Sequence, residues 1–159
     1  MKEVKPGNNS ASAFATERKP AEPGRKYDLE ERLLEFAAGV IDVSEGLPNT
    51  RAGNHLAGQF LRSGTSPYGN HGEAQAPESI DDFIHKMKIC LKELRESRRW
   101  ARLIDRKHWL GNDAKLLFVL CESEQLIRIF KASIRTAERN RCAANRSPNP
   151  RPDSSNAPG

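Results

Sequence analysis

The sequence has few of the residues on which metal centres, disulfide frameworks and membrane spans depend. Of its 159 residues, only three are cysteine and four are histidine. No CxxC pair occurs and no two histidines lie four residues apart, so we expect no zinc site, no disulfide framework and no cofactor, and a reducing cytoplasm fits best. No apolar run approaches the roughly 18 residues of a membrane span, so we expect no membrane-spanning segment. The apolar core of a signal peptide is also missing, so we expect no signal peptide.

Apolar residues are also sparse at both ends of the chain. Residues 1–26 are rich in Pro, Gly, Ser, Asn, Lys and Glu, and residues 143–159 contain four prolines and no large apolar side chain. Such segments bury too little apolar surface to offset the conformational entropy lost on ordering. The sequence therefore predicts disordered tails at 1–26 and 142–159 and one small folded domain at 27–141.

Charges of opposite sign separate along the chain, although the formal net charge is only +5. Residues 28–84 contain ten acidic and three basic side chains, whereas residues 85–110 contain nine basic and three acidic ones. A basic segment attached to an acidic one is typical of nucleic-acid contact. It fits equally well with electrostatic pairing of the two halves, within a bundle or between copies of the chain.

Apolar side chains recur at the helical period, and no strand-like alternation is sustained anywhere. This spacing predicts four helices: from Asp28 to about Ser44; from Asn49 or Thr50 to before Pro77, kinked or interrupted with a restart near Pro67; from Ser79 to near Gly111; and from Asn112 or Asp113 to about Arg139. Short connections between long helices favour an all-α, antiparallel up-and-down four-helix bundle. The predicted core row of the first helix is Leu29, Leu33, Phe36, Ala37, Val40 and Ile41, and that of the third helix begins at Ile80.

Several apolar side chains lie off these core rows. They are Ile89, Trp100 and Leu103 in the third predicted helix and Leu117 and Phe118 in the fourth. A helix that is apolar on every side is buried on every side, but a four-helix monomer buries only one stripe of each helix. The sequence therefore predicts a second interface, formed between copies of the same chain.

The stretch RSGTSPYGNHGEAQ, residues 62–75, contains residue types found in catalytic loops. A triad of Ser66, His71 and Glu73 would need all three groups within hydrogen-bond reach of one another. Residues two apart on a helix point in different directions, so we expect no catalytic site here. The i, i+3 spacing instead predicts a structural polar pair between Asn70 and Glu73, and it leaves the role of His71 open. The glycines predicted to allow a close approach between helices are Gly64, Gly69 and Gly72.

Basic side chains cluster late in the third predicted helix. They are Arg95, Arg98, Arg99, Arg102, Arg106 and Lys107, and four of them, Arg95, Arg99, Arg102 and Arg106, fall at i, i+4, i+7 and i+11 on one face. A row of this kind can bind phosphates with little sequence preference. Alternatively, these arginines pair with Glu93, Glu96, Asp105 or the acidic first helix, in the same chain or in a neighbouring copy.

Three segments together resemble a known family. The first helix reads LEERLLEFAAGVIDVSEGLP, the third reads FIHKMKICLKELRESRRWARLI, and between them Arg62, Ser63, Ser66, Asn70 and Glu73 follow a Leu-x-x-Ser-x-x-Ser-x-x-x-Asn-x-x-Glu-like pattern. From about Tyr27 to Arg139, the chain resembles the four-helix-bundle proteins related to the protein encoded in intervening sequences of bacterial large-subunit ribosomal RNA genes. The resemblance implies a symmetric pentamer with a central channel and no enzymatic activity. A related branch, the accessory proteins of diversity-generating retroelements, binds nucleic acid.

These observations predict a non-enzymatic, self-assembling helical bundle, with copies of itself and RNA or DNA as its partners. Nucleic acid would bind without sequence specificity through the basic helix face. The alternative is a structural or protein-interaction scaffold that has no role in nucleic-acid binding.

Overall fold

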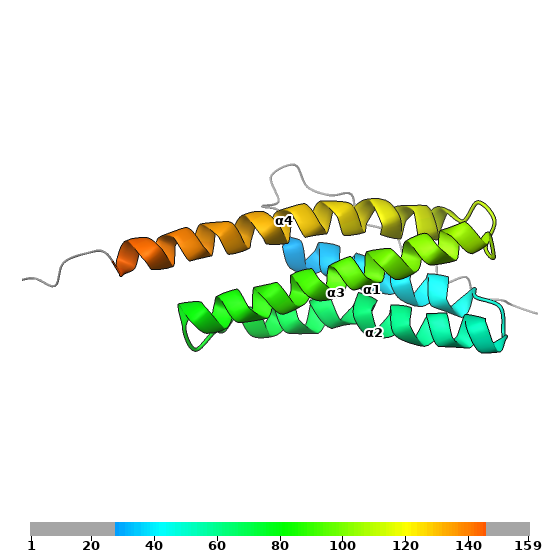
Figure 1. The fold of residues 1–159 in the computed structure, drawn as a ribbon, viewed down its shortest axis with the longest axis horizontal. Coiled ribbons are helices and arrows are strands. Elements are labelled where there is room, and N and C mark those ends of the chain that lie inside the picture. Colours follow the sequence, from blue (N-terminus) through cyan, green and yellow to red (C-terminus); the bar gives the residue numbers. More distant parts are fainter. Residues whose placement is uncertain (1–27, 146–159) are drawn as a thin grey trace, which may run out of the picture.

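The computed structural model describes residues 28–145, and its four regular elements are all α-helices. They are α1 (Leu29–Glu45), α2 (Arg51–Ala74), α3 (Ile80–Lys107) and α4 (Ala114–Ala144), and Figure 1 shows them lying alongside one another. Each helix packs against the next one in sequence, and α4 packs back against α1. The predicted up-and-down four-helix bundle is therefore confirmed. The predicted tails lie largely outside the described residues, but α4 continues past the predicted domain end at 141.

Each helix begins at a side chain that accepts a hydrogen bond from a backbone N–H in the first turn. The capping residues are Asp28, Thr50, Ser79 and Asp113. Such a cap stabilises a helix by about 1 kcal/mol, because it satisfies N–H groups that have no partner within the helix. The structure thus selects Thr50 over Asn49 and Asp113 over Asn112.

The core lies between the four helices and contains most of the predicted positions. Its fully buried large side chains include Leu33, Phe36, Val40, Phe60, Leu94, Ile104, Leu126 and Phe130. Two predictions are wrong, because Ile41 and Ile80 are each 45% exposed. Ile41 lies five residues after Phe36, which places it about 140° around the helix, and Val43 takes the core position instead. Ile80 is the first residue of α3, at one end of the bundle.

The predicted interruption of the second helix is also wrong, because α2 is continuous through Pro67. A proline inside a helix removes one backbone hydrogen bond and costs about 3 kcal/mol. Here the proline ring is fully buried, and its carbonyl oxygen lies 3.6 Å from the Cys90 Sγ of α3. Packing against α3 therefore offsets the cost of a proline inside the helix, which was the reason to predict an interruption.

Only one of the three glycines predicted to allow close packing does so. A Cβ at Gly64 would lie 2.5 Å from Cγ1 of Val40, so α1 and α2 approach each other closely here. Gly69 and Gly72 have no atom within 4 Å of a Cβ position, and both are exposed. The prediction of close packing at these two glycines is therefore wrong.

We expect Gly64→Ala to lower the free energy of unfolding by about 1–3 kcal/mol, because the added methyl group would press on Val40. Gly72→Ala is the matched control on the same helix. It should leave stability unchanged or raise it by up to about 1 kcal/mol, because alanine is the better helix former. Urea denaturation followed by circular dichroism measures both, and equal effects of the two substitutions would contradict the close approach.

Candidate binding cleft between α3 and α4

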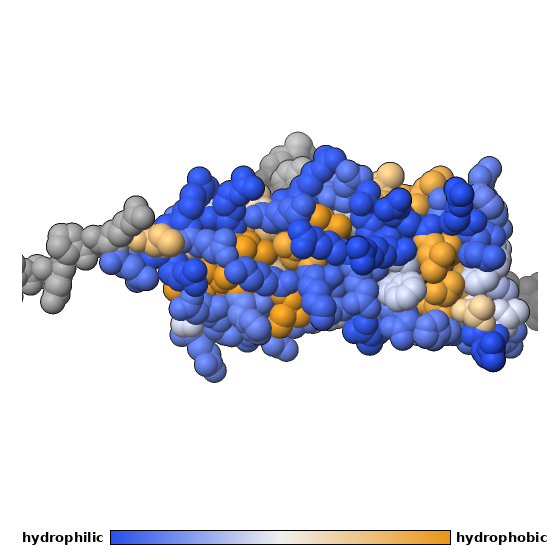
Figure 2. Space-filling model, in the orientation of Figure 1, coloured by the Kyte–Doolittle hydropathy of each residue, from blue (hydrophilic) through white to orange (hydrophobic). Residues whose placement is uncertain are grey.

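A cleft of about 1170 Å³ runs along α3 and α4. The two helices diverge with distance from their connecting hairpin (Figure 1), and apolar atoms are visible among charged ones on this face (Figure 2). Leu91, Ile127 and Ile134 provide apolar lining between the helices. Two ion pairs bridge the gap between the helices, one from Arg98 to Glu124 at 3.3 Å and one from Lys88 to Glu138 at 2.7 Å.

The rim of the cleft on α3 is strongly basic. Its cationic lining residues are Lys88, Lys92, Arg95, Arg98, Arg99 and Arg102. Glu96 and Glu138 are its acidic lining residues. The cleft therefore has an apolar floor and an excess of positive charge, which favours an anionic occupant that also carries apolar groups.

The predicted arginine row lies along this rim and continues beyond it. Arg95, Arg99, Arg102 and Arg106 are all exposed, and none has an ion-pair partner within residues 28–145. The remaining members of the predicted cluster behave differently, because Arg98 pairs with Glu124 and Lys107 lies 5.8 Å from the centre of the Trp109 ring. Within the described part of the chain, the four arginines are thus free of ion pairs.

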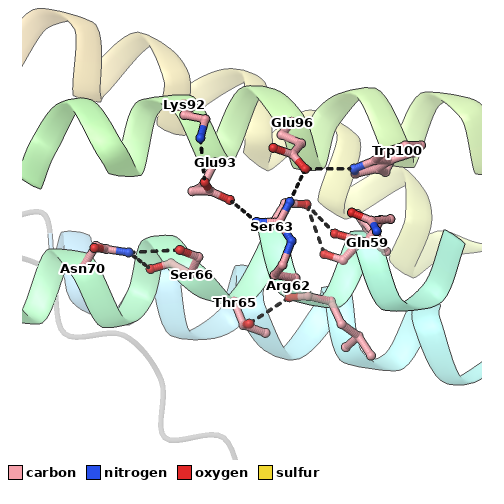
Figure 3. A network of polar contacts seen from close by, with 12 residues as sticks. Gln59, Arg62, Ser63, Thr65, Ser66, Asn70, Lys92, Glu93, Glu96 and Trp100 are labelled. Atoms are coloured by element: carbon pink, nitrogen blue, oxygen red, sulfur yellow. Dashed lines mark hydrogen bonds and ion pairs between the residues drawn. The ribbon is translucent and has the colours of Figure 1, made fainter. Parts of the chain in front are cut away.

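Two of the carboxylates proposed as alternative partners, Glu93 and Glu96, are engaged by other residues. Arg62 of α2 reaches Glu96 and also lies 3.7 Å from Glu93, as Figure 3 shows. Lys92 lies 3.7 Å from Glu93 on the other side, and the Trp100 indole N–H donates to Glu96 at 3.5 Å. This network connects α2 to α3, and within residues 28–145 it leaves the arginine row without an ion-pair partner.

The polar side chains of the stretch 62–75 have separate partners. The Asn70 side chain donates to the hydroxyl and carbonyl oxygens of Ser66, both at 2.9 Å, and Glu73 lies 3.6 Å from Lys86. His71 shares a 2.9 Å hydrogen bond with Gln75. Of the predicted polar pair, Asn70 therefore turns back along α2, and Glu73 reaches across to α3.

His71 is a core residue, which the sequence analysis missed. It is 5% exposed, and its ring meets Phe130 of α4 edge to face, with the ring centres 6.1 Å apart. Burial lowers the pKa of His71, against the opposing effect of Glu30 and Asp28. Among the described residues, its Nδ1 atom has no hydrogen-bond partner. The spacing of 71 from Phe60 and Gly64, at i+11 and i+7, was the available signal that it shares their buried face.

We expect the bundle to lose stability as the pH falls below about 6.5, the ordinary pKa of histidine. In this range the unfolded chain binds a proton at His71, but the folded chain does not, because burial lowers the pKa of this residue. Unfolding therefore becomes more favourable as the pH falls. The loss should level off once the pH is below the lowered pKa of the folded state. Urea midpoints between pH 7.5 and 5 test this expectation, and His71→Gln should flatten the profile. An equally steep profile in that variant would assign the effect to other groups.

Cys90 is buried, whereas Cys121 and Cys142 are exposed. Burial raises the pKa of the Cys90 thiol to about 12, so it stays protonated. Within residues 28–145, no three His, Cys, Asp or Glu side chains form a group that could hold a metal ion. None of the four described helices is both long and apolar enough to cross a membrane.

The apolar side chains predicted to form an interface lie mainly on the surface. Leu117 is 54% exposed, Phe118 is 42% exposed and Leu103 is 41% exposed, whereas Ile89 and Trp100 are partly buried. Leu34 and Ile41 of α1 are two further large apolar side chains on the surface, 42% and 45% exposed. The sequence analysis placed Ile41 in the core and did not identify either residue as exposed.

Comparison with solved structures places this bundle in a family. A crystal structure of a protein of unknown function from the S23 ribosomal protein family of Bacteroides thetaiotaomicron matches with a TM-score of 0.60 and 30% sequence identity. The match covers 66% of this chain and 96% of that one. The chain belongs to the S23 ribosomal protein family. Comparison of this S23 family member with family models and with curated proteins gives no match.

The S23 match agrees with the resemblance of the sequence to four-helix-bundle proteins. It suggests no activity, because the matched protein is itself of unknown function. The relation to the intervening-sequence protein remains a prediction. For this S23 family member, the α3–α4 cleft and the exposed apolar side chains are the features from which a function can be argued.

Proposed function

We propose that this chain is a non-enzymatic binding protein that works as a homo-oligomer. The observation that supports assembly is the exposure of large apolar side chains on adjacent helices, namely Leu34 and Ile41 on α1 and Leu117 and Phe118 on α4. Single exposed apolar residues are common, but a group of this size on neighbouring helices is typical of an interaction surface. The number five, for a pentamer, rests on the family resemblance.

Burial of such side chains provides the driving force. Covering one leucine, isoleucine or phenylalanine contributes about 1.5–3 kcal/mol when it is fully removed from water. Phe118 also lies against α1, where a Cβ at Gly39 would be 3.3 Å from its ring. The apolar group of α4 is therefore held next to α1, and one partner surface could cover both helices.

We expect the full chain at micromolar concentration to have a mass that is a multiple of 17.8 kDa, five times this value for a pentamer. Leu117→Glu should lower the mass and leave the helical circular dichroism unchanged, because the side chain lies on the surface. Ala132→Glu is the matched control, since it adds the same charge at another exposed position of α4. Light scattering after size exclusion measures the mass, and a monomeric wild-type chain would contradict the proposal.

Nucleic-acid binding is the second candidate, and the arginine row favours it. Arg95, Arg99, Arg102 and Arg106 project from one helix face without ion-pair partners in the described residues. Such a row can contact phosphates without reading sequence. RNA or DNA would then bind along α3. The first candidate rests on the exposed apolar side chains and the second on the arginine row, so substitutions in each group separate the two by experiment.

A further inference from the structure

We propose that the α3–α4 cleft of one copy receives the outward face of α1 from a second copy, head to tail. This inference rests on the proposed self-assembly and identifies the surfaces that meet. The outward face of α1 is defined here by its apolar row, Leu34, Ala38 and Ile41, and by the acidic residues beside it, Glu31, Glu35 and Glu45.

The outward face of α1 combines apolar and acidic groups in the arrangement that the cleft requires. Leu34, Ala38 and Ile41 follow the i, i+4, i+7 spacing of one helix face and are all exposed. Glu31, Glu35 and Glu45 are exposed too, and none has an ion-pair partner within residues 28–145. In all, α1 contains five acidic side chains and one basic one.

The cleft presents the complementary surface. Its floor is formed by Leu91, Ile127 and Ile134, and its α3 rim carries cations from Lys88 to Arg102. In all, α3 contains nine basic and five acidic side chains. Lys88 and Arg98 pair with Glu138 and Glu124, so the rim arginines without a partner in residues 28–145 extend from Arg95 to Arg102, about 10 Å of helix. The acids from Glu31 to Glu45 extend over about 21 Å, which is enough to cover them. The carboxylates of one helix can therefore lie opposite the cations of the other while the apolar rows meet between them.

The geometry of the bundle requires that this α1 comes from another copy. Within the chain the neighbouring helices of α1 are α2 and α4, and α1 lies behind α3 in Figure 1. The outward face of α1 and the cleft are thus different surfaces of one molecule. A contact between unlike surfaces is head to tail, and it forms a ring when the rotation from one copy to the next closes.

Charge and hydrophobicity together favour α1 over a nucleic acid as the occupant. A phosphate backbone would neutralise the rim but would bring no aliphatic group to the apolar floor. The outward face of α1 supplies carboxylates for the rim and Leu34 and Ile41 for the floor. Complementary charges steer association and fix its register, while apolar burial supplies the affinity.

Charge reversal on each surface tests the contact. Arg95→Glu/Arg99→Glu reverses the charge of the cleft rim, and Glu35→Lys/Glu45→Lys reverses the charge of the outward face of α1. All four positions are exposed. Each variant alone should assemble at least about 100-fold more weakly, because like charges would face each other. A chain carrying all four substitutions should regain the wild-type mass. Arg135→Glu/Arg139→Glu, exposed on α4 away from the cleft lining, is the matched control and should assemble normally.

The outcomes separate this contact from the proposal on which it rests. A monomeric wild-type chain would overturn self-assembly itself. A wild-type oligomer whose mass is unaffected by Arg95→Glu/Arg99→Glu, or equally affected by the control, would overturn only the head-to-tail contact. If the cleft variant keeps its mass but loses binding to a fluorescent single-stranded RNA, nucleic acid occupies the cleft and the contact is wrong. Recovery in the fourfold variant would establish it.

Discussion

Replacing Phe130 with alanine should lower the free energy of unfolding by about 3–5 kcal/mol. Phe130 is fully buried on α4, and its ring contacts the edge of His71 from α2. Truncation would leave a cavity between helices that are not neighbours in the ring of four, and close-packed helices can fill it only in part. The loss would be a large fraction of the 5–15 kcal/mol typical of a small domain.

Tyr68→Ala provides the control for this prediction. Tyr68 is a comparable aromatic residue on α2, but it is 37% exposed, so its removal should cost less than about 1 kcal/mol. Chemical denaturation of both variants at the same protein concentration gives the comparison. A Phe130→Ala protein as stable as Tyr68→Ala would show that the centre of the bundle is not packed as described.

The nucleic-acid candidate predicts a loss of affinity of roughly 100-fold when the salt concentration is raised fourfold, if four arginines each contact one phosphate. The contacts would come from Arg95, Arg99, Arg102 and Arg106, and phosphates release bound counterions when cations replace them. Arg99→Gln/Arg102→Gln should then weaken every sequence about equally and reduce the salt slope by about two units. Fluorescence anisotropy with labelled RNA and DNA measures this dependence.

The control for the arginine variants is Arg135→Gln/Arg139→Gln, which removes the same charge from an exposed part of α4 outside the cleft lining. If both double variants weaken nucleic-acid binding equally, the attraction is a general effect of net charge and not of the arginine row on α3. Absence of binding at low salt would rule out the candidate. In that case a lower oligomer mass for Arg99→Gln/Arg102→Gln would support the use of the row in assembly.

Some residues in the stretch 62–75 show how local reasoning succeeded and failed. The sequence predicted that Ser66, His71 and Glu73 would not meet, because positions on one helix have fixed directions. In the structure these side chains contact Asn70, Gln75 and Lys86, respectively. It did not identify His71 as buried against Phe130, since that contact depends on where α4 lies. It also missed that Pro67 continues a helix, because the packing that compensates for the proline comes from α3.

The sequence by itself determined the number of helices, their order, most of their capping residues and most of the core positions. These features depend on interactions within a few residues, namely the helical period and side chains that bind nearby backbone N–H groups. Only the tertiary structure decided which glycine is close-packed and which carboxylates pair with Arg62. It also decided which arginines have no ion-pair partner within residues 28–145 and where a cleft opens. These depend on the relative placement of whole helices, which sets distances between residues far apart in the chain and is not encoded in any local pattern.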